Sequence, residues 1–251
     1  MARWQQVVSL CGVLLAYQVQ VPGAFAERFE VDRADDDPAA SACTAEVNDC
    51  TLRGAVLAAH ADMTQAHTIV IREGQYLLSL RGAGEDEAAT GDLDIRTDVQ
   101  IIGAGARQTV ILSSRIDPIT DDRVFHVHAG GSLTLRDLAV RSGRSNGGGA
   151  LRAERDSSAR LERLIVSGNE AVDGGGIFMD GSLIATESTI SGNSATSGGG
   201  GLYVGMNAAG IDLRQVTISE NSAVTGAGAL IDGGEAMLRR STIASNRASG
   251  A

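Results

Sequence analysis

Residues 183–204 have the sequence LIATESTISGNSATSGGGGLYV, and this stretch decides the fold class. Apolar Leu183 and Ala185 stand two residues apart, and a two-residue polar corner separates them from Ser188 and Ile190, which repeat that spacing. A spacing of two is typical of a β-strand, because alternate side chains face the same side. A glycine run then leads into Leu-Tyr-Val at 202–204, which predicts a third strand. Three short strands without a helical period predict one coil of a parallel β-helix.

The same pattern occurs five times from residue 133 onward, at intervals of about 25 residues. The fourth apolar column of these repeats holds Val140, Val166, Ile190, Ile218 and Ile243. A column of Gly and Asn follows it, at Gly143, Asn169, Asn193, Asn221 and Asn246. Gly and Asn best tolerate the left-handed backbone region, and stacked Asn side chains can hydrogen-bond between coils. We therefore expect this column to form a structural turn ladder with a left-handed backbone.

The repeats predict an all-β fold, a right-handed parallel β-helix (solenoid) with a short N-terminal capping helix. The handedness follows from the general rule for parallel crossovers. Residues 68–129 contain strand-like segments with less regular spacing, which predicts irregular first coils, and residues 130–251 form the regular repeats. The sequence stops in the middle of a coil with no cap or anchor in sight, so we expect a truncated C-terminus.

Residues 1–26 have the features of a signal peptide. Arg3 precedes an apolar segment at 7–16, and Ala24-Phe25-Ala26 fits an A-x-A cleavage site. The apolar segment is too short to cross a bilayer, so the mature chain is expected to contain no transmembrane segment. Cleavage after Ala26 predicts a chain that is secreted or attached to the surface of a bacterial cell.

Residues 27–67 are expected to form a cap that covers the open strand edges of the first coil. Cys43 and Cys50 are an even pair in an exported chain, which predicts a disulfide. Thr51 is a candidate helix N-cap. The apolar side chains after it fall on one helical face, and they are Leu52, Ala55, Val56, Ala59 and Met63.

The composition excludes several classes of protein. The 251 residues carry a formal net charge of −10 and contain no Lys, which disfavours nucleic acid as a partner. A hydrophobic share of 43% is too high for a disordered chain. The 32 glycines follow no three-residue period, which excludes collagen.

Four motifs together resemble the CSLREA family of exported bacterial proteins. They are Cys50-Thr51-Leu52-Arg53-Gly54-Ala55-Val56, Thr90-Gly91-Asp92-Leu93-Asp94-Ile95, Ile102-Gly103-Ala104-Gly105-Ala106 and Asp122-Arg123-Val124-Phe125. The resemblance covers residues 28–251 and implies a secreted or surface-attached right-handed β-helix, without implying an established activity. Gly54 stands where the family has Glu. The capping box is therefore open, and we expect a weaker cap helix than in the relatives.

An acidic group in the irregular coils is the candidate metal site. Asp92 and Asp94 flank Leu93 and should share one face of a strand, with Glu85 and Asp86 in a nearby loop. Carboxylate oxygens suit Ca²⁺, which is the only cofactor that the sequence suggests. The alternative is a solvated acidic face that binds no ion.

Asp121, Asp122 and Arg123 are the catalytic candidates if the protein is an enzyme. Paired carboxylates hydrolyse glycosides, and an Arg suits a polysaccharide lyase. His126 and His128 follow at a spacing of two, which equally fits an ordinary strand face. The structural alternative is favoured here, because nothing in the sequence fixes the distance between Asp121 and a partner.

Phe178 and Tyr203 are the binding candidates. Alternation points both side chains outward on neighbouring coils, in one column with Arg152 below and Ile231 above. Such a patch can bind sugar rings, or it can be a ladder that stiffens the surface. The leading hypothesis is adhesion to an extracellular polysaccharide or another cell surface without catalysis. The alternative is a polysaccharide lyase, hydrolase or epimerase that acts along one face.

Overall fold

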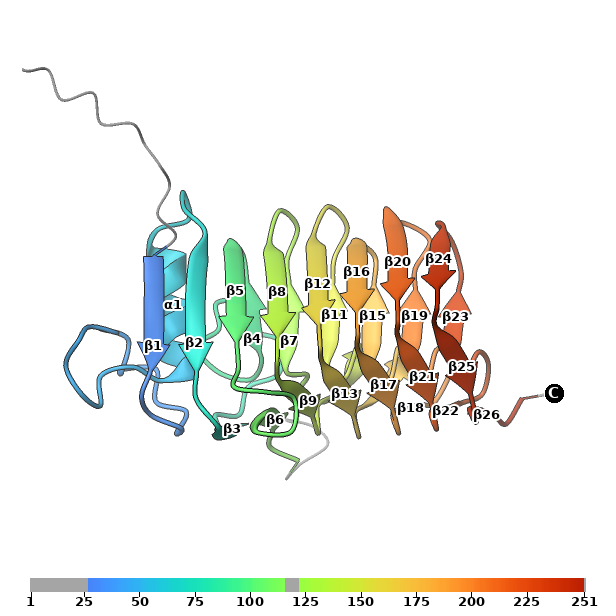
Figure 1. The fold of residues 1–251 in the computed structure, drawn as a ribbon, viewed down its shortest axis with the longest axis horizontal. Helices are drawn as coiled ribbons and strands as arrows, with labels where there is room; N and C mark the ends of the chain where they lie inside the picture. The colour runs from blue at the N-terminus through green and yellow to red at the C-terminus, as the bar shows by residue number, and fades with distance from the viewer. Residues whose placement is uncertain (1–26, 116–121, 251) are drawn as a thin grey trace, which may run out of the picture.

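The computed structural model describes residues 27–115 and 122–250 and forms a parallel β-solenoid (Figure 1). The coils stack from the blue N-terminal end to the red C-terminal end, and each coil contributes strands to separate sheets. Neighbouring strands pair in parallel in every sheet, as predicted. The right-handed course of the coils stays a prediction.

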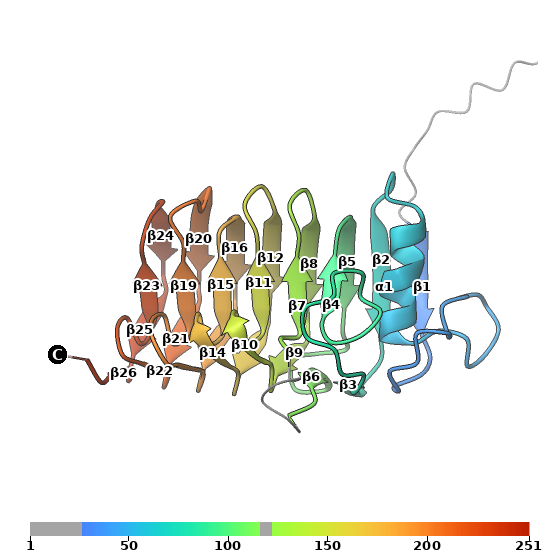
Figure 2. The ribbon, with the colours of Figure 1, turned by 180° about the vertical axis from the view of Figure 1, so that it is seen from behind.

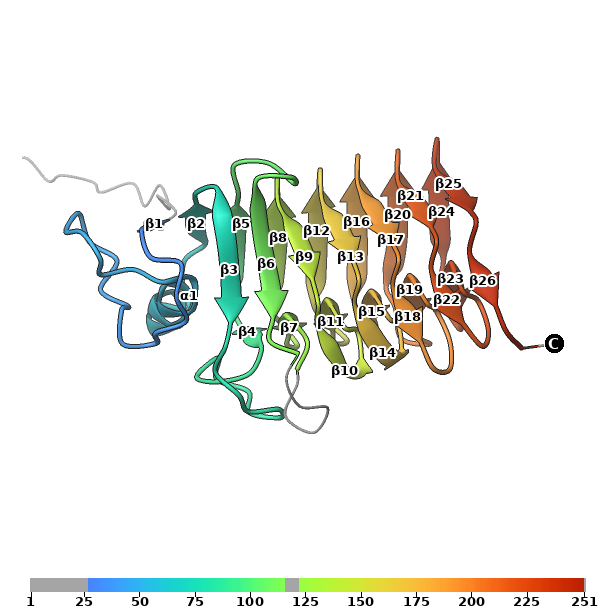
Figure 3. The ribbon, with the colours of Figure 1, turned by 90° about the horizontal axis from the view of Figure 1, so that it is seen from below.

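Four sheets make up the walls of the solenoid. Sheet 1 consists of β1 (Glu27–Val31), β2 (His67–Ile71), β5 (Asp98–Ile102), β8 (Ser132–Arg136), β12 (Ser158–Glu162), β16 (Ser182–Thr186), β20 (Gly210–Arg214) and β24 (Ala236–Arg239). Sheet 2 consists of β3 (Gly74–Leu78), β6 (Thr109–Ser113), β9 (Ala139–Arg141), β13 (Ile165–Ser167), β17 (Thr189–Ser191), β21 (Thr217–Ser219) and β25 (Thr242–Ala244), seen from below in Figure 3.

The other two sheets close each coil. Sheet 3 consists of β10 (Arg144–Gly147), β14 (Glu170–Asp173), β18 (Ser194–Ala195), β22 (Ser222–Ala223) and β26 (Arg247–Ala248). Sheet 4 consists of β4 (Leu93–Ile95), β7 (Phe125–Val127), β11 (Leu151–Ala153), β15 (Ile177–Met179), β19 (Leu202–Val204) and β23 (Ala229–Ile231), seen from behind in Figure 2. The repeats predicted three strands per coil, and sheet 3 adds a fourth. Its strands span only two to four residues and carry no apolar alternation that a sequence pattern could reveal.

The predicted apolar columns fill the interior. Val140, Val166, Ile190 and Ile218 are all buried, and Ile190 pairs in register with Ile218. Ile243, in the last described coil, is 48% exposed, because a coil covers it on one side only.

The turn ladder forms, although its backbone differs from the expectation. The left-handed residues are those one position before the Gly/Asn column, namely Ser142, Gly168, Gly192, Glu220 and Ser245. A second left-handed column lies at the polar corners, at Asp137, Arg163, Glu187, Gln215 and Arg240. The expectation of a left-handed backbone at the Asn residues was therefore wrong. The preceding residue makes the turn, which leaves each Asn side chain free to hydrogen-bond along the stack.

The cap contains α1 (Leu52–Ala61) and the predicted Cys43–Cys50 disulfide. Thr51 is the N-cap, and its hydroxyl accepts a hydrogen bond from the Gly54 N–H at 2.9 Å. Leu52, Val56 and Ala59 are buried as predicted. Met63 lies beyond the end of the helix and is 56% exposed, so its assignment to the buried face was wrong.

Gly54 is required by the packing of the cap. A Cβ at this position would lie 1.9 Å from the carbonyl oxygen of Ala40, which is a steric overlap. The residue that opens the capping box therefore allows the segment before α1 to lie directly against the helix.

Candidate functional site

A loop formed by residues 79–92, here called the covering loop, lies outside the solenoid beside β4 and β7 (Figure 2). Its start is fixed by Asp36, whose carboxylate accepts the N–H groups of Ser79 at 2.7 Å and Leu80 at 2.9 Å. Glu85 holds the loop internally by accepting the N–H groups of Glu87 and Thr90. This predicted metal ligand is thus used for loop structure.

Arg53 joins the cap helix to the covering loop. Its guanidinium is fully buried and donates to both carboxylate oxygens of Asp36, at 2.6 and 3.2 Å. It also donates to the carbonyl oxygens of Ala88, Gly91 and Asp92. Sequence reasoning gave Arg53 no role, because its partners lie up to 39 residues away and no local pattern points to them.

Asp92, Asp122 and Arg123 meet where the covering loop ends. Arg123 Nη1 lies 3.0 Å from Asp92 Oδ2, and the backbone N–H of Arg123 donates to Asp122 Oδ1 at 2.8 Å. Both carboxyl groups are buried, at 1% exposure for Asp92 and 5% for Asp122. Asp121, the third catalytic candidate, lies outside the described residues.

Burial and mutual repulsion change the acidity of this carboxyl pair. Burial raises the pKa of Asp92 to about 8, and the charge of Asp122 adds to the effect against the opposing pull of Arg123. Burial also raises the pKa of Asp122. Asp122 Oδ2 has no hydrogen-bond partner within the described part of the chain. One positive charge thus faces two buried carboxyl groups, which favours the protonated form of one of them.

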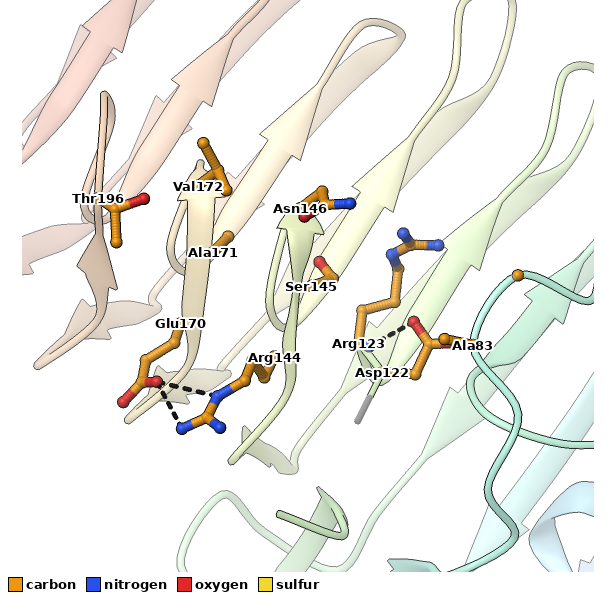
Figure 4. A pocket seen from close by; sticks show the side chains of 11 residues that line it. Ala83, Asp122, Arg123, Arg144, Ser145, Asn146, Glu170, Ala171, Val172 and Thr196 are labelled. Carbon is orange, nitrogen blue, oxygen red and sulfur yellow. Dashed lines mark hydrogen bonds and ion pairs between the residues drawn. The ribbon is translucent and has the colours of Figure 1, made fainter. Parts of the chain in front are cut away.

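A groove of about 550 Å³ begins at Asp122 and Arg123 and follows the outer surface of sheet 3 (Figure 4). Further residues that line it come from the covering loop, at Ala83 and Gly84, and from β10, β14 and the segment after β18, and include Ser145, Asn146, Val172 and Thr196. An ion pair between Arg144 and Glu170, at 2.9 Å, lies along the same groove. The groove has the volume of a small-ligand site and offers hydroxyl, amide, carboxylate and guanidinium groups to a ligand.

The remaining metal candidates, Asp86 and Asp94, belong to a second group of side chains. Asp94 and Asp86 come together with His126 and His128, whereas Asp92 pairs with Arg123 and Glu85 stays in its loop. Asp94 is fully buried, so the alternative of a solvated acidic face does not hold for it or for Asp92. Burial alone would raise the pKa of Asp94. Hydrogen bonds with His126, His128 and the Ala88 N–H outweigh burial and hold that pKa well below its usual range.

The aromatic column on sheet 4 has the predicted stacking. The rings of Phe178 and Tyr203 lie 4.9 Å apart with their planes 6° from parallel, and the Arg152 guanidinium lies 5.0 Å from the Phe178 ring centre. Tyr203 pairs in register with Leu230 rather than Ile231. The assignment of Ile231 to this column was wrong, because Ala229 fills the inward position where a larger apolar residue was expected.

The stacking determines which part of each ring a ligand can reach. Phe178 has Arg152 on one face and Tyr203 on the other, so its edge is what faces outward. The Tyr203 hydroxyl donates to Asp232 at 3.1 Å, which fixes the second ring. Sugar binding by this column stays a prediction, and the geometry equally fits a ladder that stiffens the sheet.

Comparison with known protein families gives a match to a repeat. Residues 187–205 match the family model of the Chlamydia polymorphic membrane protein repeat, a repeat of surface proteins. The matched segment runs from the corner before β17 to the end of β19 and includes Asn193, the glycine run and Tyr203. No curated protein and no solved structure matches the chain. In the part of the chain that the structure describes, no helix has the length and hydropathy needed to span a membrane.

Proposed function

We propose that the chain is an exported surface protein of a bacterium that binds an extended, uncharged polysaccharide, without catalysis, in the groove on sheet 3. The groove is the observation that carries this proposal. Asn146 and Thr196 are both exposed and occupy corresponding positions on sheet 3, with the coil of β14 between them, so their polar groups can meet separate units of an extended chain. Val172, 41% exposed, adds apolar surface between them.

The surface assignment is supported by the repeat match and by the signal-peptide features. Residues 187–205 resemble a repeat of membrane proteins, and the N-terminal sequence has the features of an export signal. A disulfide between Cys43 and Cys50 suits an oxidising compartment outside the cytoplasm.

The charge favours an uncharged ligand. The chain carries a net charge of −10, which repels an acidic polysaccharide at low ionic strength. Within the groove, Arg144 and Glu170 already pair, and Arg123 faces Asp92. The groove therefore offers hydrogen bonds more than net charge, and sugar hydroxyl groups are suitable partners for them.

The test compares two double variants in affinity electrophoresis against a panel of neutral and acidic polysaccharides. Asn146→Ala with Thr196→Ala removes two exposed polar groups from the groove. The matched control, Asn207→Ala with Thr217→Ala, removes the same chemical groups from exposed positions elsewhere. Two lost hydrogen bonds of about 0.5–1.5 kcal/mol each should weaken binding on the order of tenfold.

The result expected is weaker binding of a neutral polysaccharide by the groove variant alone. Equal binding by the groove variant, the control and the wild type would remove the groove from consideration. A loss of binding in Phe178→Ala with Tyr203→Ala, with the groove variant unaffected, would assign recognition to the aromatic column.

Catalysis is the second candidate, favoured by one observation. Asp122 and Arg123 place a carboxyl group and a cation together at the end of the groove, which are residue types that polysaccharide-cleaving enzymes use. Long incubation with each polysaccharide, followed by measurement of new reducing ends, tests this candidate. Product that forms with the wild type and not with Asp122→Asn would replace the binding proposal by an enzymatic one.

A further inference from the structure

A group of four side chains lies where the covering loop meets the solenoid. Asp94 belongs to β4 and His126 to β7, and the two residues pair in register. His128 follows β7, and Asp86 comes from the covering loop. One ligand atom from each of the four lies within 4.8 Å of the other three. The four atoms thus surround a single point from separate elements of the chain.

The two imidazole rings direct nitrogen atoms at the same carboxylate oxygen. Asp94 Oδ1 lies 2.7 Å from His128 Nε2 and 3.5 Å from His126 Nδ1. The ring centres are 4.0 Å apart and tilted by 42°, so the rings converge without stacking flat. Ligand atoms of a tetrahedral zinc site are separated by about 3.3 Å, as follows from bonds of about 2.0–2.1 Å. Movements of less than about 1 Å would therefore bring these two pairs of atoms to metal-site spacing.

The ring nitrogens and the carboxylate oxygen that point away from the shared centre also have neighbours, as is usual for metal ligands. Glu154 accepts at 3.2 Å from His126 Nε2 and lies 3.9 Å from His128 Nδ1, on the sides of the rings that face away from Asp94. The Ala129 N–H donates to Glu154, and the Ala88 N–H donates to the second oxygen of Asp94 at 2.8 Å. A carboxylate behind each metal-binding histidine is the usual arrangement that orients the ring.

The geometry points to a binding site for one divalent transition-metal ion, of the Zn²⁺ class, with Asp94, His126, His128 and Asp86 as ligands. Imidazole nitrogen suits Zn²⁺ and its neighbours, whereas Ca²⁺ requires oxygen ligands. Three of the ligands are buried or partly buried in the solenoid, and Asp86 is exposed on the loop. Bound metal would tie the outer part of the covering loop to β4 and β7. This site is separate from the groove on sheet 3, and its test uses no polysaccharide.

Zn²⁺ and Co²⁺ titrations of tag-free protein, first dialysed against EDTA, test the assignment. Calorimetry should give one ion per chain, and Co²⁺ should give the visible absorption of a tetrahedral site. His126→Gln and His128→Gln should each abolish this binding. His67→Gln is the matched control, since the His67 ring nitrogens face Asp62 and Glu27 rather than the group of four, and it should bind as the wild type does.

Two gentler variants keep the test valid if the histidine variants fail to fold. Asp86→Asn changes an exposed loop side chain and should weaken Zn²⁺ binding while the circular dichroism stays unchanged. Glu154→Gln alters the group behind the rings and should weaken Zn²⁺ binding about 10–100-fold. Equal Zn²⁺ affinity in the wild type, Asp86→Asn and Glu154→Gln would overturn the site, as would tighter binding of Ca²⁺ than of Zn²⁺. If the wild type binds no Zn²⁺, the metal site is wrong and the four side chains form only a network of hydrogen bonds.

Discussion

Asn193 shows how one residue connects three coils. Its side-chain oxygen accepts from both the backbone N–H and the amide of Asn169, at 3.1 and 2.9 Å. Its amide donates to the Val166 carbonyl at 3.1 Å and to Asn221 at 3.0 Å. The residue is 1% exposed, so water cannot replace these partners.

Asn193→Ala should destabilise the fold by about 2–4 kcal/mol, because several buried polar groups lose their partners at once. The measurement is the free energy of unfolding from urea titration. Asn146→Ala is the control at an exposed position and should change stability by less than about 0.5 kcal/mol. Equal effects of the two substitutions would mean that the ladder contributes nothing beyond an ordinary surface contact.

Sequence could locate this ladder because its period equals the coil length. It could not assign the left-handed backbone to the preceding residue, since Ser142, Glu220 and Ser245 are ordinary in composition and only their place in the turn forces the conformation. The wrong strand register predicted at Ala229 also arose from a local departure from the repeat. Thr225 pairs with Gly198 and so stands where the preceding coil has the first glycine of its run. Because Leu230 is larger than Ala229, it was taken as the inward residue, which shifted the predicted register by one position.

At the scale of elements, the cap helix and the covering loop depend on one buried guanidinium. Arg53 and Asp36 form a bidentate ion pair that is shielded from water. Three backbone carbonyl oxygens of the covering loop accept the other hydrogen bonds of the guanidinium. A planar guanidinium can serve all these acceptors at once, whereas an ammonium group cannot.

Arg53→Lys should therefore fail to replace arginine. Arg53→Ala breaks a buried ion pair and should cost about 3–5 kcal/mol, and Arg53→Lys should lose most of the same amount. Urea unfolding and proteolysis within residues 79–92 measure the two effects. Arg28→Lys is the control, because the Arg28–Glu30 pair is exposed and should contribute less than about 1 kcal/mol. Wild-type stability and protease resistance in Arg53→Lys would contradict this role.

The candidate sites could be predicted only in part at this scale. The sequence singled out Asp86 and Asp94, which belong to the group of four proposed metal ligands. It also singled out Asp122 and Arg123, which lie at the end of the groove. It treated His126 and His128 as an ordinary strand face, since the pairing of β4 with β7 crosses irregular coils of unequal length. The lining of the groove depends on sheet 3, whose short strands have no sequence signature.

For the whole molecule, the buried carboxyl pair sets a pH dependence of stability. The pKa of Asp122 is near 3.8 in an unfolded chain and is raised in the fold, mainly by burial. The folded state therefore favours the protonated form. The stability from this group is fully present below about pH 4 and is lost as the pH rises through the raised pKa.

Asp122→Asn should remove the loss of stability that accompanies rising pH. Thermal unfolding midpoints of the wild type and the variant, measured with EDTA between about pH 4 and pH 8, should diverge in favour of the variant as the pH rises. Asp156→Asn, an exposed control, should follow the wild-type curve. Parallel curves for Asp122→Asn and the wild type would show that the buried pair does not titrate in this range.

The fold of the whole molecule was the most predictable feature, because the alternating apolar columns repeat many times. An irregular residue in one coil does not hide a pattern that the other coils repeat. Besides sheet 3 and the register at Ala229, one exception lies at the N-terminal end, where β1 (Glu27–Val31) pairs with β2 although residues 27–67 were assigned to the cap. A single strand without a repeat partner offers no column to recognise.

The uniform register of the stacked coils also bears on how such a gene can change. Each strand of a regular coil pairs with the corresponding strand one coil earlier and one coil later. Recombination between two repeats that adds or removes one whole coil would leave every remaining strand with a partner in register. Polar corners and Asn positions would also stay aligned. Chain length can thus vary by unequal crossing-over while the cap and the covering loop keep their structure.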